Sequence, residues 1–141
     1  MLIVVMDAQG GGVGKLLVEQ LKRTLPEQEI TAVGTNALAT AAMLRAGADQ
    51  GATGENAIRV MAERADVILA PIGMALCDAM LGEVTAAMAC AVGSSRAKKI
   101  LLPMNRCSAI IPGYPKQPMA DTVAAAVREV ECVIRNSECG M

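Results

Sequence analysis

Aromatic residues are almost absent from this 141-residue chain, which has one tyrosine, Tyr114, and neither phenylalanine nor tryptophan. Even so, 53% of its residues are apolar. A core must therefore be built from Ala, Val, Leu, Ile and Met, which are small enough to let helices pack closely on a sheet. The length is that of one domain with a substantial core. We expect this domain at residues 1–135 and a polar C-terminal tail at 136–141.

An excess of basic charge, histidine and paired cysteine motifs are also missing. The net charge is −1 with 13 dispersed basic residues, so neither a basic patch nor stacking aromatics favour nucleic-acid binding. The five cysteines form no C-x-x-C pair and there is no histidine, so we expect neither a disulfide framework nor a metal site. Free thiols fit a reducing cytoplasm, where we expect the protein. No secretory signal opens the chain, and acidic residues interrupt its longest apolar stretch, 65–92, so no membrane span is expected.

Apolar runs and turn residues alternate along the chain. The runs at 2–6 and 67–70 predict strands buried on both faces, as in parallel sheets. Further strands are predicted at 29–33, 48–52 and 100–102, with a short edge strand at 108–111. Helices are predicted at 16–25, 37–46, 53–64 (capped by Thr53) and 121–134. Residues 74–81 and 83–92 are predicted as one helix interrupted near Gly82 or as two helices. This alternation predicts right-handed βαβ units and a three-layer α/β fold of Rossmann type, with a mainly parallel sheet and helices on both faces.

The region 74–92 is apolar on nearly every side of its predicted helices. One sheet face cannot cover a helix all round, so the exposed remainder favours self-association. We expect a homodimer that buries this region.

The stretch from Asp7 to Lys15 reads D-A-Q-G-G-G-V-G-K and joins a predicted strand to a predicted helix. Glycines permit a sharp turn and a close approach of backbone amides to an anion, and the helix start adds partial positive charge. The candidate ligand-binding residues are therefore Gln9, Gly10, Gly11, Gly12, Val13 and Gly14. The dinucleotide fingerprint G-x-G-x-x-G fits with Gln9 in place of its first glycine, and the wider glycine spacing of short-chain reductases fits with Ala8 in that place.

A nucleotide-hydrolysing P-loop fits this stretch less well. Leu16 stands where that motif needs a hydroxyl to hold magnesium, so ATP or GTP hydrolysis and a metal are not expected. Three alternatives stay open: a dinucleotide such as NAD(P) or another nucleotide, a different phosphate or carboxylate ligand, and a tight turn with nothing bound.

Other candidates follow the later strands. Thr35 and Asn36 could bond a ribose or phosphate, although no carboxylate for ribose hydroxyls stands there and helix capping explains Asn36 equally well. Gly73 could line a ligand beside the first strand, and Arg106 could pair with an anion. The segment 51–56 is a second glycine-bearing helix start, for which capping is favoured.

Three residues are candidates for catalysis. Asp7 and Glu83 are candidate general bases if they lie buried beside a ligand, although a carboxylate in the first turn of a helix explains Glu83 better. Cys107 is a candidate nucleophile, but the chain has no histidine to activate it, and a packed thiol is the simpler interpretation.

Several motifs together resemble one protein family. They are D-A-Q-G-G-G-V-G-K, G-T-N-A-L-A-T, G-A-T-G-E-N-A, P-I-G and N-R-C, and the likeness covers nearly the whole chain. The family consists of short bacterial proteins catalogued as a domain of unknown function. The resemblance implies a Rossmann-like domain standing alone and brings no activity.

From the sequence we expect a stand-alone nucleotide-binding module, with NAD(P) or another nucleotide held through the glycine loop 8–15. One alternative is an enzyme acting on a small metabolite that bears a phosphate or carboxylate. Another is a structural or interaction protein in which this loop holds no ligand.

Overall fold

The computed structural model describes residues 1–104 and 108–140. Five strands form one sheet in which all pairs are parallel, in the order β3-β2-β1-β4-β5. The strands are β1 Ile3–Asp7, β2 Ile30–Gly34, β3 Gln50–Thr53, β4 Val67–Pro71 and β5 Lys98–Leu102. The helices are α1 Gly12–Thr24, α2 Ala37–Arg45, α3 Glu55–Arg64, α4 Ala86–Ser94 and α5 Met119–Cys139, with a short 3₁₀ helix η1 at Ile72–Ala75. The predicted three-layer α/β fold is confirmed.

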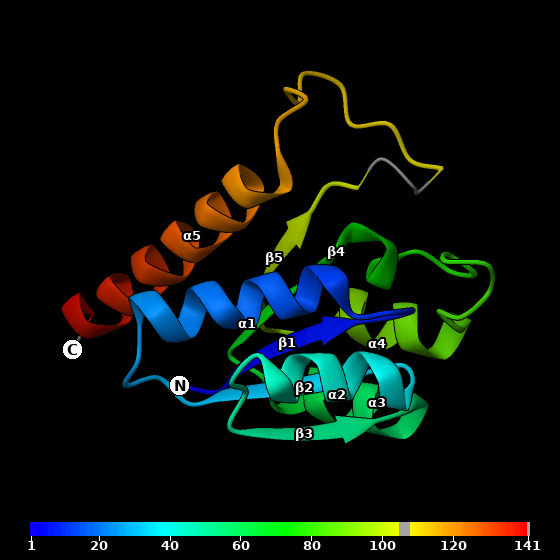
Figure 1. The fold of residues 1–141 in the computed structure, drawn as a ribbon, viewed down its shortest axis with the longest axis horizontal. Helices are drawn as coiled ribbons and strands as arrows, with labels where there is room; N and C mark the ends of the chain where they lie inside the picture. The colour runs from blue at the N-terminus through cyan, green and yellow to red at the C-terminus, as the bar shows by residue number, and fades with distance from the viewer. Residues whose placement is uncertain (105–107, 141) are drawn as a thin grey trace.

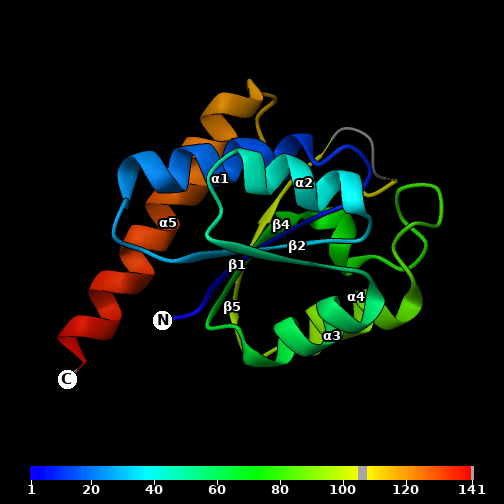
Figure 2. The same ribbon diagram turned by 60° about the horizontal axis from the view of Figure 1, so that its bottom comes forward.

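Helices cover both faces of the sheet, as Figures 1 and 2 show. The α1, α2 and α5 helices lie on one face, and α3 and α4 on the other. Alternate β1 residues face the two layers: Ile3 and Val5 pack with Leu17 of α1 and Val127 of α5, and Val4 packs on the opposite side. Because both faces of β1 are buried, its sequence is a continuous apolar run instead of an alternating one.

The two edge strands differ from the centre of the sheet. All four residues of β3 are exposed, and β5 begins with the exposed lysines Lys98 and Lys99. By contrast, every residue of β1, β2 and β4 is buried. The apolar core is therefore concentrated on the central three strands, whose carboxyl ends position the glycine loop.

The region after β4 departs from the sequence prediction. No α-helix forms over 74–81, because Asp78, Met80 and Leu81 all have positive φ angles, which break a right-handed helix. The apolar residues of this region differ in their burial: Met74 and Val84 are buried, whereas Leu81 is fully exposed. The homodimer through 74–92 stays a prediction. The structure has one α-helix in this region, α4, instead of helices over both 74–81 and 83–92.

Three smaller predictions are also corrected. Residues 108–111 form no strand. Thr53 does not cap α3, since it ends β3 and Gly54 occupies the cap position with φ 104°. The last helix continues through the polar residues to Cys139, so residues 136–139 belong to α5.

Candidate functional site

The glycine loop is a tight turn between β1 and α1, built on two residues with positive φ. Gln9 has φ 52° and Gly11 has φ 71°, and the Gly11 amide donates to the Ala8 carbonyl at 3.0 Å. A Cβ on Gly11 would lie 2.8 Å from the Cα of Ala39 in α2, so only glycine fits there. Gly10 and Gly12 are different, because a Cβ on either would meet no atom within 4 Å. These two glycines leave open space above the loop.

Gly14 brings α1 close to the first strand. A Cβ on this buried glycine would lie 2.9 Å from Asp7 Cβ and 2.5 Å from Met43 Sδ. Close packing of helix on strand is the role of the third glycine in the dinucleotide fingerprint. The spacing in which Gln9 replaces the first glycine, with Gly11 and Gly14 following, therefore matches the geometry of this turn.

Asp7 occupies the base of the loop and is 3% exposed. Its Oδ1 accepts from the Ala8 amide at 2.8 Å and its Oδ2 from the Gly14 amide at 2.7 Å, so the carboxyl caps the start of α1. Burial raises the pKa of Asp7 above its ordinary 3.8, and the amide hydrogen bonds only partly offset this effect. Asp7 thus combines a structural role with the raised pKa expected of a candidate base.

A cavity of about 290 Å³ lies beyond the carboxyl ends of β1 and β4. In parallel sheets of this order, these neighbouring strands mark the switch point at which ligands bind. The backbone amides of Gly10 and Gly12 donate no hydrogen bond to the described part of the chain. The cavity walls are mostly glycine and apolar: Asp7, Ala8, Gln9, Gly10, Gly11, Gly12, Val13, Pro71, Gly73, Met80 and Met104.

Glu83 connects three loops at the same edge of the sheet. Its Oε1 accepts from the Gln9 amide at 2.7 Å, from Asn36 Nδ2 at 2.5 Å and from the hydroxyl of Thr35. Burial alone would raise the pKa of Glu83, but these hydrogen bonds outweigh it and lower the pKa below its ordinary 4.5. The interpretation of Glu83 as a carboxylate in the first turn of a helix is wrong, because α4 begins only at Ala86.

Thr35 and Asn36 lie beside the glycine loop but do not line the cavity. Asn36 caps α2, with its Oδ1 accepting from the Ala39 amide at 2.9 Å, and its Nδ2 also donates to the Gln9 carbonyl at 3.0 Å. The capping interpretation of Asn36 is therefore confirmed. The structure adds that its amide group faces Glu83.

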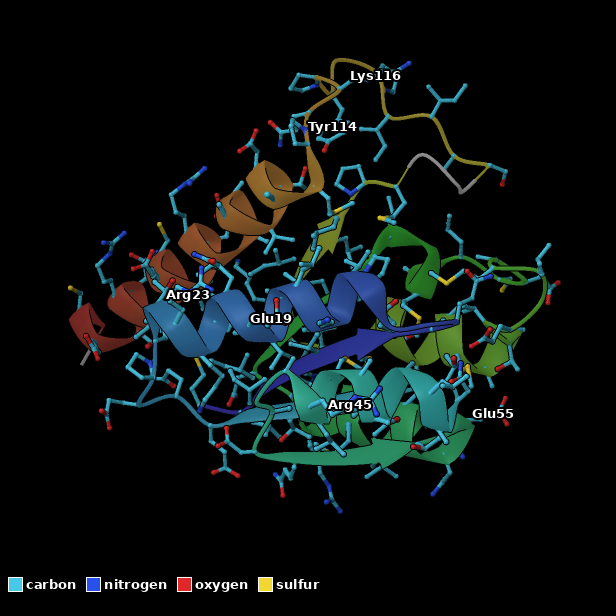
Figure 3. The ribbon with its side chains drawn as sticks, viewed as in Figure 1. Glu19, Arg23, Arg45, Glu55, Tyr114 and Lys116 are labelled. Atoms are coloured by element: carbon cyan, nitrogen blue, oxygen red, sulfur yellow. The ribbon has the colours of Figure 1, made fainter. Side chains whose placement is uncertain are left out.

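The second glycine-bearing helix start is held by an adjacent helix. Glu55, in the first turn of α3, accepts from the hydroxyl of Thr85 at 2.6 Å, and Thr85 in turn caps α4. Figure 3 shows Glu55 near the end of the molecule to which β3 points. No described side chain caps the start of α3, so the segment is held by this contact between helices and not by the cap expected at Thr53.

Two predicted residues, Arg106 and Cys107, lie outside the described residues. Tyr114, the one aromatic residue, bonds its hydroxyl to Thr122 Oγ1 at 2.8 Å, on the segment that leads into α5 (Figure 3). Within residues 1–104 and 108–140, no three His, Cys, Asp or Glu residues are grouped to hold a metal ion. None of the described helices is long and apolar enough to cross a membrane.

Sequence reasoning placed Gln9 to Val13 and Gly73 at one site, and the structure brings them together around the cavity. It missed Met80 and Met104 as cavity walls, and it missed the joining of Glu83 to Thr35. The latter pair is separated by 48 residues. No local pattern signals such a contact, although the connections after β2 and β4 both begin at the carboxyl edge of the parallel sheet.

The fold and the site together define a parallel α/β domain whose glycine turn opens onto a cavity at the switch point. A family model described as "Domain of unknown function (DUF3842)" matches residues 2–135, and the chain belongs to that family. No match was found among curated proteins or among solved structures.

Proposed function

We propose that the protein is a nucleotide-binding module that holds the phosphates of NAD(P) or another nucleotide over its glycine loop. The observation that carries the proposal is the cavity at the switch point. It is bounded by the amides of Gly10 and Gly12, which have no acceptor among the described residues, and by glycines with open space above them. Amides at the start of a helix stabilise phosphate oxygens through hydrogen bonds and through the helix dipole.

The buried Asp7 limits how much charge the loop tolerates. Its carboxyl accepts the hydrogen bond of the Gly14 amide, so that amide is already used, and an anion nearby would raise the pKa of Asp7 further. The proposal therefore depends on the outer amides of Gly10 and Gly12. It also favours a ligand whose remaining part is apolar enough to lie against Val13, Pro71 and Met80.

The test replaces the open space at Gly12. Gly12→Val places two methyl groups where the proposal puts phosphate. The Cβ of the new side chain would meet no atom within 4 Å, and Gly12 does not have the positive φ that would strain it. With NAD or ADP at ten times its Kd, the wild type gains about 1.4 kcal/mol of stability, which appears as a rise in Tm. We expect the variant to lose this rise.

Gly93→Val is the matched control, because Gly93 is an exposed glycine of α4 that also has open space around it. The control should keep the Tm rise in full. If millimolar adenine nucleotides leave the Tm of the wild type unchanged, the proposal is wrong.

The second candidate function is an enzyme acting on a small metabolite with a phosphate or carboxylate group. It is favoured by one observation, a buried carboxyl of raised pKa, Asp7, in the cavity wall. Glu83 does not share that wall, and its lowered pKa makes it a weak base. Asp7 is therefore the one described residue that this candidate retains for proton transfer.

A further inference from the structure

The Glu83 carboxylate is held firmly by one of its two oxygens. Oε1 accepts all three hydrogen bonds, from Gln9, Thr35 and Asn36. Oε2 accepts none from the described part of the chain, and no described side-chain oxygen is both buried and without a partner. The carboxylate is thus fixed in orientation, and its second oxygen is not fully buried.

The position of this carboxylate is informative. Its three donors come from the glycine loop and from the end of β2, and in a sheet of this order a dinucleotide's ribose lies between these two segments. The strand itself offers no carboxylate there, since it ends in Gly34 and is followed by Thr35 and Asn36. A carboxylate is nevertheless present, brought by the connection between β4 and α4.

The connection is shaped to deliver it. Asp78, Met80 and Leu81 adopt left-handed backbone angles, and the Asp78 amide donates to the Val84 carbonyl at 2.8 Å, which closes the turn. Met80 then lines the cavity while Glu83 reaches Gln9. The same short segment therefore contributes Met80 to the cavity wall and a carboxylate that binds the amide of Gln9, another residue of that wall.

We infer that Glu83 recognises a ribose, with Oε2 accepting a hydrogen bond from a free ribose 2′-hydroxyl. This inference rests on the proposed function and narrows it to nucleotides whose 2′-oxygen carries no phosphate, such as NAD in preference to NADP. An ionised carboxylate accepts a hydrogen bond from a hydroxyl and repels a phosphate. A single group would therefore bind a ribose with a free 2′-hydroxyl and disfavour one with a 2′-phosphate.

The test is calorimetric titration of the wild type with NAD, NADP, ADP and 2′-deoxy-ADP. A hydrogen bond to a charged acceptor corresponds to about tenfold or more in affinity. We expect NAD to bind at least about tenfold more tightly than NADP, and ADP to bind about tenfold more tightly than its deoxy analogue. The deoxy comparison uses only the wild type, so it does not depend on the folding of a variant.

Glu83→Gln keeps an oxygen for the three anchoring donors and replaces Oε2 by an amide group. We expect this variant to bind NAD more weakly and NADP more tightly than the wild type does, so that the two affinities become similar. Glu19→Gln on α1 is the control, because Glu19 lies in an exposed i,i+4 pair with Lys15, and it should leave the ratio unchanged.

The outcomes separate the two proposals. If the wild type binds nucleotides but does not distinguish NAD from NADP, the inference is overturned and the proposed function stands. If Glu83→Ala binds NAD more tightly than the wild type does, the carboxylate blocks the site and the inference is overturned. If no nucleotide binds at all, the proposed function fails, and the inference fails with it.

Discussion

Gly14→Ala tests the close packing of α1 on β1 that shapes the loop. The added methyl would lie 2.9 Å from Asp7 Cβ and 2.5 Å from Met43 Sδ. The Met43 side chain is flexible and can move, but Asp7 is fixed by two backbone hydrogen bonds at its carboxyl. Overpacking costs about 1–3 kcal/mol, and because Asp7 cannot move away we expect the upper part of this range, about 2–3 kcal/mol, whereas alanine gains about 1 kcal/mol over glycine in a helix. We expect a net loss of about 1–2 kcal/mol in the free energy of unfolding.

Gly12→Ala is the matched control two residues earlier in the same helix. Its methyl meets nothing within 4 Å, so it should be neutral or stabilise by about 0.5 kcal/mol. The chain has no tryptophan, so urea unfolding is followed by circular dichroism of the helices. At about 3 °C per kcal/mol, the Tm values of the two variants should differ by about 5 °C. A Gly14→Ala protein as stable as the control would refute the packing argument.

Two further predictions concern stability away from the cavity. Asp49→Ala removes a carboxylate that accepts from the Ile30 amide at 2.7 Å and from a lysine, and we expect it to lower the free energy of unfolding by at most about 1 kcal/mol at pH 7. The Ile30 hydrogen bond and the lysine hold the pKa of Asp49 below its ordinary 3.8, so the difference from wild type should shrink as the pH falls below 3.8. An equal difference in urea unfolding at pH 7 and below pH 3.8 would contradict this. Leu81→Gly relieves a left-handed conformation that costs about 1–2 kcal/mol, at an entropic cost of about 0.5–1 kcal/mol, and Leu81 is fully exposed and loses no packing. Its Tm should rise by about 2 °C and should exceed that of Leu81→Ala, and equal Tm values would count against strain at this position.

Much of the fold could be predicted because its signals are local. The apolar runs of β1 and β4 mark strands buried on both faces, and their turn residues mark the ends. Even the short β3 was predicted, within two residues, from its place between two helices. The glycine loop could be predicted for the same reason. The turn requires Gly11 and the packing of α1 on β1 requires Gly14, and these residues lie close together in the sequence.

What could not be predicted depends on contacts between distant segments. An apolar composition predicts a helix at 74–81, yet the segment instead turns through left-handed angles to place Glu83 against Gln9 and Thr35. Local helix propensity cannot predict these two contacts, because both partners are distant in the sequence. The cavity wall at Met80 follows from the same long-range arrangement, so the site was predicted on its glycine side and missed on its opposite side.

The edges of the sheet constrain how two copies of the chain can meet. An uncovered sheet edge can pair with another strand, but β3 is only four residues long, and the first two residues of β5 are Lys98 and Lys99. Lysines on an edge strand oppose its pairing with another strand, and two β3 edges would share too few hydrogen bonds to hold. A continuous intermolecular sheet is therefore disfavoured at either edge, and a pair of copies would have to join through helix faces or loops, leaving each sheet separate.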